Sequence, residues 1–138
     1  MDTADRPVFS DAMIERMVRS FYARVRDEPM LAPIFAAAIP GDWEPHLARM
    51  CDFWSSVLQT SGRYRGNPMA VHHRIAGITP LHFAVWLALF RQTAEDVLPP
   101  PHAADAIMRA ERESSEAVWL VASFHRFSRL FRDDIHAA

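Results

Sequence analysis

The chain has 138 residues, half of them apolar, enough for one domain whose core needs no disulfide. Fifteen Lys and Arg against seventeen Asp and Glu give a net charge of −2, whereas nucleic-acid-binding proteins usually carry a basic surface. A single cysteine, Cys51, excludes an internal disulfide and a multi-cysteine zinc site. The sequence has no uninterrupted apolar stretch of about 18 residues and no apolar signal peptide, so we expect a cytoplasmic protein without a membrane span.

Helical periodicity begins at Ser10, a good N-cap residue, and predicts a helix that ends near Arg26. Pro29 and Pro33 bracket a short turn of helix that we expect to end near Phe35. The first helix has apolar residues every four positions, which predicts one buried face: Met13, Met17, Phe21 and Val25.

A second long helix is predicted from Asp42 to about Leu58, with Pro45 tolerated in the first turn. Its apolar face consists of Leu47, Met50, Trp54 and Leu58. The polar stretch 59–67 holds two of the four glycines and is predicted to be a loop, after which Pro68 can open a short helix.

Thr79 followed by Pro80 predicts another helix start, since threonine is a good N-cap and proline suits the first helical position. That helix is expected to end before the three prolines that begin at Pro99. A last helix should run to about Phe131, with one face formed by Ile107, Met108, Ser115, Val118 and Ala122.

Without alternating strand patterns, these segments predict a single all-α domain over residues 1–138. The ends, residues 1–9 and 132–138, are expected to be loosely ordered.

His46 shares a helix face with Met50, Phe53 and Trp54, at positions i, i+4, i+7 and i+8. An imidazole that points inward from such a face must find a hydrogen-bond partner or a metal. A core or surface histidine with a local partner is the alternative interpretation.

A pair of adjacent histidines, His72 and His73, follows the predicted loop. Neighbouring residues on a helix differ by about 100° in direction, so both cannot bind the same centre well. The residues alone leave open which of the two would act as a ligand.

Tyr22 and Trp86 lie on apolar helix faces and carry polar groups that can donate hydrogen bonds. From the residues alone, a core position without a chemical role is the favoured interpretation for each.

Taken in chain order, these residues resemble the truncated haemoglobins, in particular the group III branch, over about residues 12–130. The absence of a Gly-Gly pair fits that branch. The motifs that carry the resemblance are Phe21-Tyr22, Pro33-Ile34-Phe35, Trp43-x-x-His46, Phe53-Trp54, Gly66-Asn67-Pro68-x-x-x-His72 and His82-Phe83-x-x-Trp86-Leu87-x-Leu89-Phe90.

The resemblance implies a truncated globin fold, a helical sandwich around haem b. It places His72, rather than His73, at the position of the proximal iron ligand. Tyr22, His46 and Trp86 match the distal residues that would stabilise a bound ligand, and His46 can alternatively swing onto the iron as a sixth ligand.

The resemblance also implies contacts with the porphyrin. Phe35 matches an aromatic wedge against the haem, Met50 lines the distal cavity, and Phe53 and Trp54 pack behind the haem. Arg49, Tyr64 and Arg65 are the candidates to bind the haem propionates. Cys51 is interpreted as a small packing residue.

The implied function is the binding of dioxygen, NO, CO or peroxide at a ferrous haem. One hypothesis is an enzyme that reacts bound oxygen with nitric oxide or reduces peroxide, which requires a partner reductase. A second is oxygen binding for storage, transport or sensing, and a third is a haem-free helical protein. We expect a monomer or a weak homodimer.

Overall fold

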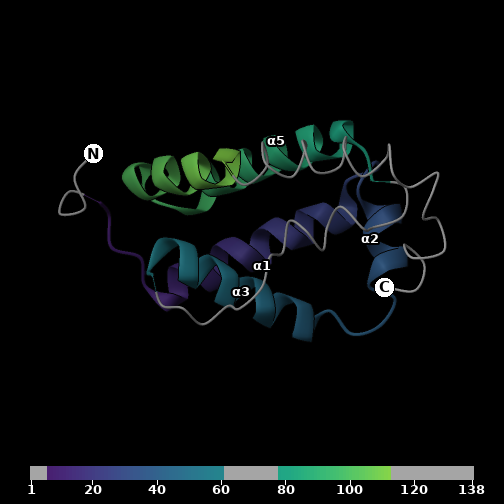
Figure 1. Cartoon of the computed structure of the whole chain (residues 1–138), viewed down its shortest axis with the longest axis horizontal. Helices are drawn as coiled ribbons and strands as arrows, with labels where there is room; N and C mark the ends of the chain where they lie inside the picture. Colours follow the sequence, from purple (N-terminus) through teal and green to yellow (C-terminus); the bar gives the residue numbers. More distant parts are fainter. Residues whose placement is uncertain (1–5, 61–77, 113–138) are drawn as a thin grey trace, which may run out of the picture.

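The computed structural model describes residues 6–60 and 78–112, which contain helices and no strands. The helices are α1 (Asp11–Asp27), α2 (Ala32–Ala38), α3 (Glu44–Leu58), α5 (Pro80–Val97) and a helix that begins at residue 100 and reaches the end of the described range (Figure 1). The predicted all-α class is confirmed. No helix in these ranges is both long and apolar enough to cross a membrane.

Helix α1 packs against α2, α3 and α5, and Figure 1 shows it between α3 and α5. Its predicted N-cap is confirmed, because the backbone N–H of Met13 donates to Ser10 Oγ over 3.1 Å. Met13 itself is only partly buried. The buried face of the helix consists of Ile14, Met17, Val18, Phe21, Tyr22 and Val25.

Helix α2 differs from the predicted short turn, which was expected to end near Phe35. It runs to Ala38, with Pro33 inside its first turn rather than at a boundary. Proline is tolerated there because the first backbone N–H groups of a helix have no partner within the helix. The alanines after Phe35 favour continuation, since alanine is the best helix former.

Helix α3 begins at Glu44, two residues later than predicted, while its predicted end at Leu58 is confirmed. Asp42 lies before the helix, where its carboxylate accepts the backbone N–H of Glu44 over 3.0 Å. At the other end, Gln59 Nε2 donates to the carbonyl oxygen of Phe9 over 2.8 Å. This bond joins the end of α3 to the segment that leads into α1.

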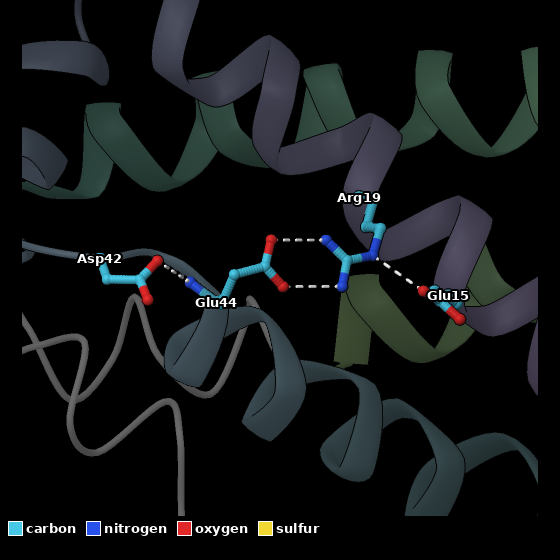
Figure 2. A network of polar contacts seen from close by, with 4 residues as sticks. All are labelled: Glu15, Arg19, Asp42 and Glu44. Atoms are coloured by element: carbon cyan, nitrogen blue, oxygen red, sulfur yellow. Dashed lines mark hydrogen bonds and ion pairs between the residues drawn. The ribbon is translucent and has the colours of Figure 1, made fainter.

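A charged network connects α1 to the first turn of α3 (Figure 2). The guanidinium of Arg19 makes two parallel bonds of 3.0 and 2.9 Å to the carboxylate of Glu44, and a third of 3.0 Å to Glu15. The hydrogen bonds from Arg19, together with its positive charge, lower the pKa of the Glu44 carboxyl. The two parallel bonds join α1 to the first turn of α3.

Helix α5 has the predicted N-cap, Thr79, with Pro80 in its first turn. The side chains of Thr79 and His82 form a reciprocal capping box. The Thr79 backbone N–H donates to His82 Nδ1 over 3.0 Å, and His82 N–H donates to Thr79 Oγ1 over 3.5 Å.

The helix over 100–112 buries a different face from the predicted one. Met108 is 46% exposed, Ile107 is partly buried, and the face against the core consists of Ala103, Ala106 and Ala110. Small side chains allow close packing there, whereas the prediction was based on large apolar residues. The other predicted members of this face, Ser115, Val118 and Ala122, lie outside the described residues.

The core is rich in stacked aromatic rings. Phe90 is fully buried between two indoles, with ring centroids 5.0 Å from Trp54 and 5.7 Å from Trp86 at interplanar angles of 15° and 12°. Phe21 of α1 meets Phe90 edge-on at 5.2 Å. Phe90 therefore joins α1, α3 and α5 in one cluster.

Replacing Phe90 with alanine should lower the free energy of unfolding by about 3–5 kcal/mol, because it removes a ring from a packed site and leaves a cavity. Urea unfolding followed by far-ultraviolet circular dichroism measures this loss. Leu81→Ala is the control, since Leu81 is 61% exposed on the same helix. Equal stabilities of the two variants would contradict this account of the core.

Candidate functional site

Tyr22 of α1 and His46 of α3 lie next to each other. Their ring centroids are 5.0 Å apart and the rings meet at 87°, edge to face. The two residues are on different helices and 24 positions apart in the sequence. The packing of α3 on α1 therefore brings a phenol and an imidazole together.

One polar atom of His46 has no partner in the part of the chain that the structure describes. Its Nε2 is buried and makes no hydrogen bond with any described residue. Burial lowers the pKa of the imidazole to about 4, and the nearby charge of Arg49 acts in the same direction. At neutral pH the ring is therefore uncharged, and each of its two nitrogens has one role, donor or acceptor.

Tyr22 is 2% exposed. Burial raises the pKa of its phenol above the ordinary value, so the hydroxyl keeps its proton and can donate. Phe35 of α2 lies on another side of the phenol ring, with centroids 6.4 Å apart. The phenol of Tyr22 is thus surrounded by apolar and aromatic side chains.

Trp43 contacts both of these residues. Its ring centroid lies 5.5 Å from that of His46 and 6.0 Å from that of Tyr22, and the guanidinium carbon of Arg26 lies 4.8 Å from it. Trp43 belongs to the motif Trp43-x-x-His46, from which no role was predicted for it. Its spacing of three residues from His46, one helical turn, was the available signal.

The other residues of α3 that were discussed in the sequence analysis differ in how far they are exposed to solvent. Met50 and Phe53 are buried on α3, and Phe53 meets Trp54 edge-on at 5.3 Å. Arg49 is exposed on the same helix. Cys51 is half-buried against the core, and burial raises the pKa of its thiol.

Trp86 is buried on α5 and packs on Phe21 and Phe90, with a centroid distance of 5.1 Å to Phe21. Within the described ranges these ring contacts place it in the aromatic core, next to the residue that precedes Tyr22. They do not join it to His46. Its role as a donor stays a prediction.

Four predicted site residues, Tyr64, Arg65, His72 and the alternative His73, lie outside the described residues. Among residues 6–60 and 78–112, no group of three or more His, Cys, Asp or Glu side chains can hold a metal ion. The described part of the site is therefore the side that carries Tyr22 and His46.

Comparison with known proteins identifies relatives of this arrangement. A group 3 truncated hemoglobin (ctb) of Campylobacter jejuni is 32% identical over 83 residues, which are 58% of this chain and 65% of that protein. The crystal structure of a group III truncated hemoglobin from Campylobacter jejuni superposes with a TM-score of 0.77 at 26% identity, over 83% of this chain and 92% of that one. Both findings confirm the resemblance inferred from the sequence.

The family comparison covers most of the molecule. A family model described as bacterial-like globin matches residues 8–118, a range that includes every helix described above. The chain belongs to the bacterial-like globin family.

Proposed function

We propose that this protein binds haem b and takes up dioxygen and other diatomic ligands, with Tyr22, His46 and Trp86 as hydrogen-bond donors to the ligand. One observation carries the proposal: His46 Nε2 is buried without a partner among the described residues, beside the phenol of Tyr22. An unsatisfied buried polar group costs about 1–3 kcal/mol. A ligand that bonds to this nitrogen accounts for its position.

The described residues fit a haem. Phe35, Met50 and Phe53 offer buried apolar side chains for a porphyrin, and exposed Arg49 offers a positive charge for a propionate. Trp54 supports this side from the core, and Tyr64 and Arg65, outside the described residues, are the further propionate partners that we propose. A haem, when bound, supplies an iron that takes the diatomic ligand and pushes negative charge onto it.

Tyr22 and His46 are suited to stabilise that charge. The phenol keeps its proton at neutral pH, and the uncharged imidazole has one N–H to donate. Hydrogen bonds to charged acceptors contribute about 1.5–3 kcal/mol each. Two such bonds slow ligand release on the order of a hundredfold, because about 1.4 kcal/mol is a factor of ten.

Slow release suits chemistry on the ligand better than delivery of oxygen. We propose that the protein combines bound dioxygen with nitric oxide to form nitrate. The balance of this reaction requires one electron, which a partner reductase restores to the haem after each turnover. The donors hold the ligand in place while nitric oxide enters.

Replacing Tyr22 with Phe or His46 with Leu should each raise the oxygen dissociation rate roughly tenfold or more, because each change removes one donor. Trp86→Phe tests the third donor in the same way. Stopped-flow replacement of oxygen by CO measures the rates. Phe9→Leu serves as control, since Phe9 is a buried aromatic that contacts His102 at the other end of the core. Rates within twofold of wild type for all three donor variants would refute the proposed ligand site.

The proposed proximal ligand, His72, has a matched control in its neighbour His73. His72→Gly should lose the haem or change its absorption spectrum, and added imidazole should restore the spectrum by replacing the missing ligand. His73→Ala should keep the wild-type spectrum. The opposite pattern would assign the proximal role to His73.

The low pKa of His46 also gives a measurable result. In the diamagnetic ferrous carbonyl form, NMR of ¹³C-labelled histidine should show His46 uncharged from pH 8 down to about pH 5, because burial disfavours the imidazolium. The missing signal in His46→Leu assigns the resonance. Titration of this signal near the ordinary histidine pKa, roughly 6.5, would contradict the burial that the structure shows.

A further inference from the structure

Four side chains from α1 and the start of α3 are linked by a series of ring contacts. Tyr22 and Arg26 lie one turn apart on α1, and Trp43 and His46 lie one turn apart at the start of α3. Tyr22 contacts His46, His46 contacts Trp43, and Arg26 lies over the indole of Trp43. Trp43 therefore connects His46 to Arg26 in this series of contacts.

We propose that Trp43 is a positioning residue, which holds the His46 imidazole toward Tyr22, and that Arg26 holds the indole in turn. This inference rests on the proposed function, in which His46 donates to the ligand.

His46 needs such support because hydrogen bonds do not supply it. Within residues 6–60 and 78–112, its Nε2 has no partner, and the side chain is only partly buried. An imidazole with two rotatable bonds can leave this orientation for solvent. The edge-to-face contacts with Trp43 at 86° and Tyr22 at 87° restrict the ring from two sides.

Trp43 is itself well fixed. It is 8% exposed, and its carbonyl oxygen accepts the Leu47 N–H over 2.9 Å, so its backbone is part of the first turn of α3. The guanidinium of Arg26, 4.8 Å from the ring centroid, lies within the range of a cation–π contact. Loss of the indole would free space beside His46, and loss of the guanidinium would remove a contact that holds the indole.

The test compares Trp43→Leu, which removes the ring, with Trp43→Phe, which keeps an aromatic edge. Trp43→Leu should raise the oxygen dissociation rate roughly tenfold, close to the rate of His46→Leu. Trp43→Phe should stay within about threefold of wild type, Arg26→Gln should fall between, and Phe9→Leu is the control for loss of a buried aromatic.

A double variant shows whether Trp43 acts through His46. Trp43→Leu combined with His46→Leu should release oxygen at the same rate as His46→Leu alone, within twofold. A further rise of more than threefold would overturn the proposal, because Trp43 would then act by another route.

NMR gives a readout that does not depend on ligand release. In ¹³C-histidine-labelled ferrous carbonyl protein, the ring signal of His46 should be narrow and shifted by the ring currents of Trp43 and Tyr22. It should move toward the position of a solvent-exposed histidine in Trp43→Leu and return in Trp43→Phe. An unchanged His46 signal in Trp43→Leu would overturn the positioning role.

The two proposals fail in different ways. If His46→Leu leaves the dissociation rate unchanged, the donor role of His46 is wrong, whatever the NMR spectra show. If His46→Leu raises the rate and Trp43→Leu does not, the donor role stands and the positioning role is wrong.

Discussion

Helix α1 carries two adjacent aromatic residues that point in different directions, and the arrangement of the other helices depends on burying both. Phe21 meets Trp86 and Phe90 of α5, while Tyr22 meets Phe35 of α2 and His46 of α3. Neighbouring side chains on a helix diverge by about 100°, so one helix can serve two different surroundings. One direction leads into an apolar core, and the other leads to the polar atoms of the candidate site.

The position of α3 is controlled at both ends, and this control matters because His46 is in its first turn. Arg19 bonds Glu44 at the start of the helix (Figure 2), and Gln59 bonds the Phe9 carbonyl at its end. The pair of Arg19 and Glu44 is exposed, so its contribution is to direction more than to stability. With contacts at both ends, α3 can shift little along α1, and the imidazole of His46 stays next to the phenol of Tyr22.

Much of the fold was predictable because local chemistry determines it. The caps at Ser10 and Thr79 and the end of α3 followed from residue types alone. Three predictions were wrong: the length of α2, the start of α3 and the buried face of the helix over 100–112. These features depend on helix packing or on the tolerance of proline in the first turn of a helix. Small residues carry a weak periodic signal, although they permit the closest approach of helices.

The candidate site was predictable in part. The resemblance singled out Tyr22 and His46, and the structure places them in contact, whereas their chemical roles stay predictions. The contacts of Trp43 with Arg26 and Tyr22 depend on the crossing of two helices, which no spacing within one helix reveals. The buried Nε2 of His46, which has no partner among residues 6–60 and 78–112, could not be predicted for the same reason, because burial depends on how the helices pack.

The capping box of α5 restricts which residues position 82 accepts. The imidazole of His82 receives the Thr79 backbone N–H at Nδ1, so that nitrogen carries a lone pair and the proton is on Nε2. Glutamine and glutamate offer an oxygen at a comparable reach and are interchangeable with histidine here on these grounds. Lysine and arginine side chains have hydrogen-bond donors and no acceptor. Either residue at position 82 would therefore leave the backbone N–H of Thr79 without this side-chain acceptor.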